Sequence, residues 1–222
     1  VLTGVNAMYI NYGGTLQGAG TVVSAYVQAN GGSIELSGIL DTPQLYVPFG
    51  TVDPAGISAT SILNSGSLSL WYGTLRMQFA SDADYDQVNV AGVVDLGYST
   101  LELTVGYTPI IGQQFTLINN DDTDAVVGTF NNQPEGSLIA TDNNLFRISY
   151  VGGDGNDVVL TRMAAGFWSG GAGAGNARWR TAANWADGVV PSPGEPLYFP
   201  SNAAQLSTIN NFPAGTSFNS IN

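Results

Sequence analysis

The stretches GGTLQGAG (13–20) and GGSIELSG (31–38) decide the predicted fold, because each places a short apolar–polar strand between glycine-rich turns. The pattern returns in SGSLSLWYG (65–73) and LGYSTLELTVG (96–106), at a spacing that is first near 18 residues and then looser. Short strands that recur in this way are typical of a β-solenoid, in which each coil buries its face on the next. A sandwich of regular hairpins is the alternative, but the near-repetition and the scarcity of Asn-Gly and Asp-Gly turns favour the solenoid. We therefore predict β-solenoid coils over residues 1–106.

Alternation of apolar and polar residues with a period of two dominates the chain. The segments TLRMQF (74–79), TLELTV (100–105) and LFRISY (145–150) each place apolar side chains on one face and polar side chains on the other. This alternation is typical of half-buried β-strands. No window of a dozen residues shows the 3.6-residue period of an amphipathic helix, so the predicted fold class is all-β, with helix close to absent.

The sequence pattern changes twice after residue 106. Residues 107–163 alternate strands and turns around one acidic loop, which predicts an antiparallel β-meander that ends in the GGDGNDVVLT hairpin and caps the solenoid. Residues 164–200 are rich in glycine, alanine and proline, but their large apolar rings favour a compact junction over a flexible linker. The side chains predicted to form the junction core are Trp168, Trp179 and Trp185. Residues 201–222 return to short strands and predict the start of a further β module.

The charge composition excludes several classes of function. The chain has five basic residues, all of them Arg, against 17 acidic residues, and its net charge is −12. Binding to nucleic acid is excluded on this ground, because phosphate contacts need clustered Lys and Arg. The sequence also lacks Cys and His, which excludes disulfides, the usual zinc sites, thiol nucleophiles and His-based triads.

The same composition predicts where the protein acts. An acidic chain without Lys or Cys that is rich in Asn, Thr and Gly is typical of bacterial extracellular proteins, so we predict an extracellular, cell-surface location. No apolar run approaches the roughly 18 residues of a membrane span, which predicts no membrane insertion. The first ten residues, VLTGVNAMYI, do not resemble a signal peptide, so we expect a mature protein or an excerpt of a longer one.

Several stretches resemble the autotransporter-associated β-strand repeats of very large bacterial surface proteins, common in planctomycetes and their relatives. The stretches that carry the resemblance are DYDQVNVAGVVDLGYSTLELTVGYTP (84–109), GQQFTLINNDDTDAVVGTF (112–130), FRISYVGGDGNDVVLT (146–161) and FWSGG…NWADGVVPSPGE (167–195). The resemblance covers most of residues 13–222. It implies a surface-attached chain of β-solenoid modules separated by Trp-containing junctions. The role that it implies is adhesive or architectural, and it supplies no catalytic residues.

Residues 152–160, GGDGNDVVL, match the nonapeptide of calcium-binding parallel β-rolls. One copy supplies only half of such a site, and alternating strands flank it, so a hairpin turn with positive-φ glycines is the simpler interpretation. Two further oxygen-rich loops, 82–86 and 119–124, suit a hard cation such as Ca²⁺ unless they are merely solvated. Calcium is thus the one cofactor considered, and its candidate ligands are Asp82, Asp84, Asp86, Asp121, Asp122, Asp124, Asp154 and Asp157.

Two other classes of function stay open beside a structural role. Polysaccharide-acting β-helix enzymes need two carboxylates, and Glu35, Asp95 and Glu102 alternate outward. The absence of Lys and His, and of an Arg near Glu35, argues against catalysis, so no catalytic residue is predicted. An adhesin would bind surface glycans by ring stacking, although stacking between coils is the simpler role for aromatic side chains. The aromatic candidates are Tyr9, Tyr12, Tyr26, Trp71 and Tyr72.

The two ends of the chain are predicted to belong together. SFNSIN (217–222) stops within an apolar–polar alternation and VLTGVNAMYINYGG (1–14) begins within one. Written consecutively, they form a pair of coil strands. The predicted partners are therefore copies of the chain or tandem modules of one longer chain, assembled end to end into a structural surface fibre or layer. The predicted assembly residues are Val1, Leu2, Phe218, Ile221 and Asn222.

Overall fold

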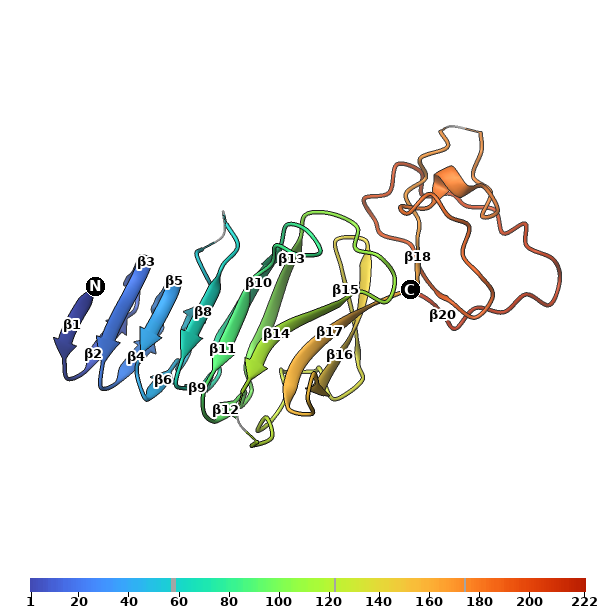
Figure 1. The fold of residues 1–222 in the computed structure, drawn as a ribbon. Coiled ribbons are helices and arrows are strands. Elements are labelled where there is room, and N and C mark those ends of the chain that lie inside the picture. Colours follow the sequence, from blue (N-terminus) through green and yellow to red (C-terminus); the bar gives the residue numbers. More distant parts are fainter. Residues whose placement is uncertain (57–58, 122, 174) are drawn as a thin grey trace.

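The computed structural model describes residues 1–56, 59–121, 123–173 and 175–222, and these form an all-β fold. The described residues form three sheets, of twelve, five and three strands (Figure 1). Helical structure among the described residues is limited to one 3-10 turn, Ala182–Asn184. The prediction of an all-β chain with helix close to absent is therefore confirmed.

Each sheet draws its strands from a different set of segments. The strands of the twelve-stranded sheet are β1 (Leu2–Val5), β3 (Thr15–Ser24), β5 (Ser33–Asp41), β7 (Thr51–Val52), β8 (Ile62–Ser65), β10 (Thr74–Phe79), β11 (Gln87–Val90), β13 (Thr100–Val105), β14 (Gln114–Asn120), β15 (Leu138–Thr141), β16 (Asn144–Gly152) and β17 (Asp157–Met163). The strands of the five-stranded sheet are β2 (Met8–Asn11), β4 (Val27–Asn30), β6 (Gln44–Tyr46), β9 (Ser67–Ser69) and β12 (Val94–Asp95). The strands of the three-stranded sheet are β18 (Gly166–Phe167), β19 (Pro196–Tyr198) and β20 (Ser220–Ile221).

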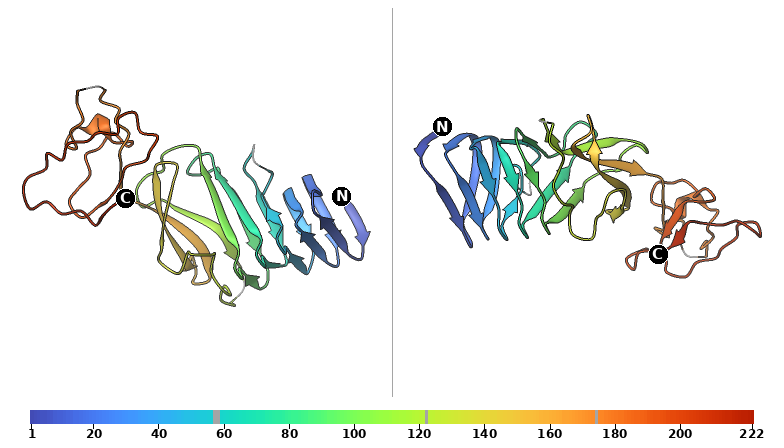
Figure 2. Two further views of the ribbon diagram at one scale, coloured as in Figure 1. Left: turned by 180° about the vertical axis from the view of Figure 1, so that it is seen from behind. Right: turned by 90° about the horizontal axis from the view of Figure 1, so that it is seen from below.

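The strands from β1 to β13 pair with one another in parallel throughout the described residues. The chain alternates between the large sheet and the five-stranded sheet, which lie along each other (Figure 2). The hydroxyl residues that lie side by side in consecutive strands are Thr15, Ser33, Thr51, Thr74 and Thr100, spaced by 18, 18, 23 and 26 residues. This register matches the regular and then looser spacing expected from the sequence.

Two ladders of aliphatic side chains fill the space between the two sheets and belong to one core. In the large sheet, the ladder is Leu16, Ile34, Val52, Leu75 and Leu101. In the five-stranded sheet, it is Met8, Val27, Leu45, Leu68 and Val94. Because burial of each such side chain stabilises the fold by about 1.5–3 kcal/mol, the period-two alternation fixes the register of every strand.

The predicted boundary at residue 106 is wrong. β14 pairs in parallel with β11, with Val88 opposite Ile118, so the parallel part extends to Asn120. β14 also pairs in antiparallel with β17, and there the meander of β15, β16 and β17 begins. Residues 106–113 are thus an insertion within one passage of the chain, and the sequence does not distinguish such an insertion from a linker. The predicted hairpin at the glycine-rich nonapeptide is confirmed, because Gly152 in β16 pairs with Asp157 in β17.

The three tryptophans of the C-terminal lobe, residues 164–222, pack into one buried cluster with Leu197. The ring of Trp168 stands edge-on to that of Trp185, with centroids 5.3 Å apart. The indole N–H of Trp168 donates to the carbonyl of Gln205 over 2.6 Å. Among the described residues after 200, regular strand is limited to β20, so the further β module expected there is only a short segment.

A buried ion pair connects β17 to the lobe. The side chain of Arg162 in β17 is fully buried and contacts Asp187 of the lobe at 3.2 Å. It also donates to Asn144 over 3.0 Å and to the carbonyl of Met163. Burial lowers the pKa of the Arg162 guanidinium below its ordinary value, while the charge of Asp187 opposes that shift.

Candidate functional site

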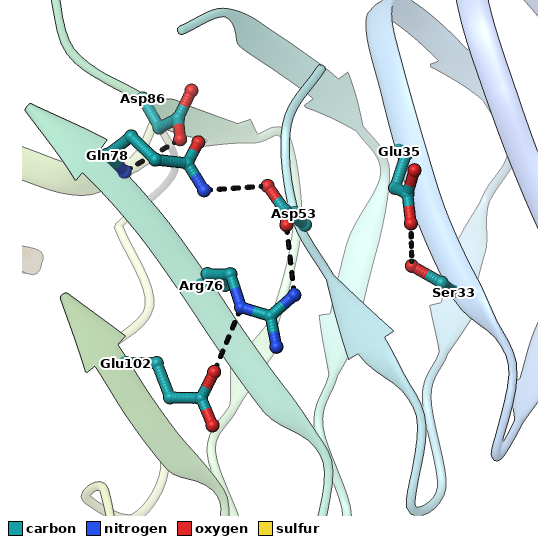
Figure 3. A network of polar contacts seen from close by, with 7 residues as sticks. All are labelled: Ser33, Glu35, Asp53, Arg76, Gln78, Asp86 and Glu102. Atoms are coloured by element: carbon teal, nitrogen blue, oxygen red, sulfur yellow. Dashed lines mark hydrogen bonds and ion pairs between the residues drawn. The ribbon is translucent and has the colours of Figure 1, made fainter. Parts of the chain in front are cut away.

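A row of polar side chains crosses three consecutive strands of the large sheet (Figure 3). Arg76 in β10 lies between Asp53, directly after β7, and Glu102 in β13, because β10 pairs in register with both strands. Its guanidinium contacts Asp53 at 3.2 Å and Glu102 at 2.9 Å. The amide of Gln78 donates a further bond to Asp53 over 2.9 Å. The side chain of Asp53 is fully buried, whereas that of Glu102 is about half exposed.

The row continues toward the amino terminus through Glu35, which register places beside Asp53. Glu35 accepts a hydrogen bond from the hydroxyl of Ser33 over 2.8 Å (Figure 3). This row was not predicted from the sequence. The residues of the row stand third in a repeated triplet of hydroxyl, aliphatic and polar residues, and this repeat is the sequence pattern that could have predicted the row. The triplets are TLQ, SIE, TVD, TLR and TLE, which begin at positions 15, 33, 51, 74 and 100.

The three outward carboxylates considered for catalysis do not form a pair. Glu35 and Glu102 share the row but are three strands apart, which corresponds to about 14 Å at about 4.8 Å per strand. The two carboxylates of a glycosidase are roughly 5–9.5 Å apart. Asp95 lies in the other sheet, in β12, where its carboxylate accepts the backbone N–H of Gly97 over 3.0 Å.

Asp86 ties the segment before β8 to β10. Its two carboxylate oxygens accept the backbone N–H groups of Ser61 over 2.7 Å and of Gln78 over 2.8 Å. Burial raises the pKa of Asp86 to about 7, the negative charges of Asp53 and Asp84 add to this rise, and the two backbone hydrogen bonds oppose it. An open hollow of about 550 Å³ lies beside Gln78 and Asp84.

The raised pKa of Asp86 predicts that stability depends on pH. Because the pKa rises from 3.8 to about 7 on folding, the folded state binds this proton more tightly. The stabilisation is therefore fully present below about pH 4 and is lost as the pH rises through about 7. We expect urea unfolding to give a higher free energy of unfolding at about pH 5 than at about pH 8, at constant ionic strength. Asp86→Asn should reduce the difference, whereas Asp41→Asn, at an exposed site, should leave it unchanged; an unchanged difference in Asp86→Asn would contradict this assignment.

The three acidic side chains of the first candidate calcium loop have separate partners. Asp82 accepts the hydroxyl of Tyr107 over 2.8 Å, and Asp84 accepts the hydroxyl of Thr60. Asp86 is held by the two backbone N–H groups described above. Residues 80–84 form a turn, with backbone bonds to the carbonyl of Asp84, rather than an extended strand. The three carboxylates therefore do not converge on one point.

The other two candidate calcium loops lie against each other. Asp157 accepts the backbone N–H of Asn120 over 2.9 Å, and the amide of Asn156 donates to the carbonyl of Asp124 over 3.2 Å. Asp121 and Asp154 are exposed, and Asp122 lies outside the described residues. Within the described ranges, no three acidic residues are grouped so that they could hold a metal ion. Calcium binding stays a prediction, and calorimetric titration with a chelator control tests it.

Three exposed aromatic rings form a column along the turns that lead into the large sheet. Phe49 stacks on Tyr72 with centroids 5.6 Å apart, and Tyr72 stacks on Tyr98 at 5.2 Å. Trp71 packs edge-on against both tyrosines. The three stacked residues have φ between 52° and 57°, a region that bulky side chains rarely adopt. Stacking between consecutive passages of the chain therefore holds these residues against backbone strain.

Substitution of the middle ring separates stacking from strain. Tyr72→Ala removes two stacks, each worth about 0.5–1.5 kcal/mol, and keeps the positive φ. Tyr72→Gly removes the same stacks but relieves the strain, so we expect it to be about 1 kcal/mol more stable than the alanine variant. Urea unfolding of the two variants measures this difference. Equal stability would show that the positive φ at this position carries no strain.

The remaining aromatic candidates lie near the amino-terminal end. Tyr9 in β2 and Tyr26 contact each other with centroids 6.2 Å apart. Tyr12 is 75% exposed, and its ring lies against Gly31. Trp71 is 43% exposed. Tyr12 is thus more exposed than Trp71 and than the three stacked residues, which are 50–62% exposed.

The residues predicted to form end contacts lie near two outer strands. Leu2 is the first residue of β1, which is an outer strand, and Val1, which precedes it, is almost fully exposed. Ile221 lies in β20, the outer strand of the three-stranded sheet, and is 63% exposed. Phe218 packs into the tryptophan cluster, and the backbone N–H of Asn222 donates to β19 over 2.9 Å.

Comparisons with known proteins add no identity to this geometry. No family model, no curated protein and no solved structure matches the chain. The resemblance to the autotransporter-associated repeats therefore stays a prediction. Among the described residues, no helix combines the length and the apolar character needed to cross a membrane.

Proposed function

We propose that this chain is a structural, non-enzymatic module of an extracellular bacterial surface fibre or layer, in which copies or tandem modules assemble end to end. The observation that carries the proposal is the parallel strand pairing, in which strands from successive passages of the chain stack in register. The partners would be further copies of the module, with neither nucleic acid nor membrane insertion involved.

The finer architecture in this proposal is a β-solenoid that ends in a meander and a tryptophan-rich junction. It is supported by the regular parallel register and by the alternation of the chain between two sheets. In such architectures each unit contacts only its neighbours, so a terminal unit lacks a partner on one side.

The two outer edges differ from each other. Among the described residues, β1 pairs only with β3, and β20 pairs only with β19. The amino terminus lies at one end of the long axis, and the lobe that holds β20 lies at the other (Figure 1). Unpaired edges template pairing with another chain, and the sequence has no Lys to block them. A contact between two different edges is heterologous, and it produces a filament when the rotation does not close.

Two observations bear on the alternative functions, an enzyme and a glycan-binding adhesin. In the polar row, Asp53 and Glu102 are paired with Arg76. Glu35 and Glu102 lie too far apart for glycoside hydrolysis, which supports a non-enzymatic role. A glycan-binding adhesin is the second candidate, and the exposed rings of Tyr12 and Trp71 favour it. A glycan array tests the adhesin: binding that is lost in Trp71→Ala would favour it over the structural module.

Self-association of the purified chain tests the proposal. Ser33 donates its backbone N–H to Gly14 over 3.0 Å, so the alternation of the parallel ladder directs the N–H of Gln17 away from β5 and toward the open edge of β3. Sedimentation velocity should give a series of sizes that grows with concentration for the native chain and for Gln17→Ala. Gln17→Pro removes the outward donor and should stop the growth. A native chain that stays monomeric at every concentration would contradict end-to-end assembly.

A further inference from the structure

Two segments that are far apart in the sequence meet where the parallel strands give way to the meander. β14 pairs with β17, which brings Asn120, the last residue of β14, beside Asp157, the first residue of β17 (Figure 1). The backbone N–H of Asn120 donates to the carboxylate of Asp157 over 2.9 Å, and its side-chain amide donates to the carbonyl of Asp124 over 2.8 Å. Asn120 therefore lies between two aspartates, one from each segment.

Two oxygen atoms in this junction are buried without a hydrogen-bond partner among the described residues. They are Oδ1 of Asn120 and Oδ2 of Asp124. Asn120 is fully buried. The orientation of its amide is determined, because Nδ2 donates to the carbonyl of Asp124 and an oxygen in that place would face another oxygen. The unpartnered atom of Asn120 is thus an acceptor, and it shares the junction with an unpartnered carboxylate oxygen.

The junction also holds negative charge without a cation beside it. Burial raises the pKa of the Asp157 carboxyl above its ordinary value, the backbone N–H of Asn120 opposes this shift, and the charge of Asp154 adds to it. The ion pairs among the described residues are formed by Arg76 and Arg162, whose acidic partners lie elsewhere. Buried carboxylates are ordinarily paired with a cation or bound to a metal ion.

We propose that a calcium ion binds in this junction, with Oδ1 of Asn120, Oδ2 of Asp124 and the carboxylate of Asp157 among its ligands. Ca²⁺ takes roughly six to eight oxygen ligands from carboxylates, amides, carbonyls and water in a flexible geometry, whereas Mg²⁺ demands a near-ideal octahedron. Two carboxylates are few for such a site, so the dissociation constant should be about 0.1–1 mM, as in extracellular modules. The ion connects the last parallel strand to the meander. All of these ligands belong to one chain, so the proposal is independent of end-to-end assembly.

A buried water molecule is the competing occupant. Water donates two hydrogen bonds and would satisfy both unpartnered oxygens. It would leave the two carboxylates without a compensating charge, whereas a cation satisfies the oxygens and the charge together. The two occupants differ in a measurable respect, because only the ion makes the stability of the fold depend on the calcium concentration.

Calorimetric titration of the native chain with calcium chloride, after removal of metal with a chelator, tests for the ion. We expect one ion per chain and a higher melting temperature at about 10 mM calcium than with the chelator. Magnesium chloride at the same concentration should raise the melting temperature less, and sodium chloride at the same ionic strength should not raise it. No heat and no shift in melting temperature up to about 10 mM calcium would overturn the proposal in favour of water.

Asp124→Asn distinguishes a metal ligand from a carboxylate that serves the fold alone. With the chelator, the variant should be at least as stable as the native chain, because it removes an unbalanced charge and supplies a donor for Oδ1 of Asn120. With calcium the order should reverse, because loss of the ligand should weaken binding by at least about tenfold. Asp121→Asn is the matched control, since it makes the same change of charge at an exposed residue of the same loop, and it should keep nearly the native affinity. Native affinity in Asp124→Asn would overturn the proposal.

Hydrogen–deuterium exchange locates the ion without any substitution. Calcium should slow exchange of the backbone amides at Asn120 and in the turn 152–157, relative to the chelator. Asp157→Asn keeps an acceptor for the N–H of Asn120 and should lose this calcium-dependent protection. Calcium-dependent protection confined to the 82–86 loop would overturn the assignment, as would an affinity that falls in Asp121→Asn and not in Asp124→Asn.

Discussion

Asp187→Ala is expected to lower the free energy of unfolding by about 3–5 kcal/mol, because it leaves the charge of Arg162 buried without its ionic partner. The side chain of Arg162 is fully buried, and Asp187 is the one carboxylate that the structure places in contact with it among the described residues. Its other partners, Asn144 and the carbonyl of Met163, are neutral and cannot balance the charge. Urea unfolding followed by circular dichroism measures the loss.

The matched control removes both charges. Arg162→Met combined with Asp187→Asn deletes the ion pair without leaving an unpaired charge, so it should be more stable than Asp187→Ala alone. Asp154→Ala, at an exposed position in the β16–β17 turn, should change stability little. If the double variant is as unstable as Asp187→Ala, the effect comes from packing around Arg162 and not from its charge.

Trp168→Ala is expected to destabilise the lobe by about 3–5 kcal/mol, because it opens a cavity in the tryptophan cluster. The ring is 1% exposed and packs against Trp185 and Phe199. The substitution also leaves the carbonyl of Gln205 without the indole N–H that now bonds to it. Since the main core between the two facing sheets is a separate cluster, β10 and β14 should stay folded.

Hydrogen–deuterium exchange resolves the two parts of the chain. In Trp168→Ala, amides after residue 164 should lose protection, whereas amides of β10 and β14 should keep it. Trp168→Phe retains most of the apolar volume and should lose less. Equal loss of protection along the whole chain would mean that the lobe and the sheets unfold as one cooperative unit.

The register of the parallel sheets was largely predictable from the sequence because burial enforces it. The triplets that begin at Thr15, Ser33 and Thr51 recur every 18 residues, and their aliphatic members form one ladder of the core. The end of the parallel part was not predictable from alternation. β14 has the same alternation as a meander strand, and only its pairing with both β11 and β17 assigns it to the two parts of the sheet.

The polar contacts were less predictable than the core, because they depend on which residues register and insertions bring together. The row from Asp53 through Arg76 to Glu102 follows from the triplets once they are aligned, but the sequence alone did not order them in space. The partners Arg162 and Asp187 come from different parts of the fold, and no periodicity links them. Positive φ at Tyr72 also escapes prediction, because bulky residues rarely adopt it and stacking between passages outweighs that preference here.

The position of the chain ends in an assembled particle is the most direct test of end-to-end assembly. Cryo-electron microscopy of the particles formed at high concentration would locate both ends in neighbouring copies. End-to-end assembly predicts that the amino-terminal strands of one copy lie beside the carboxy-terminal lobe of the next. Particles in which both ends lie on solvated surface, with no neighbouring copy at β3 or β20, would contradict it.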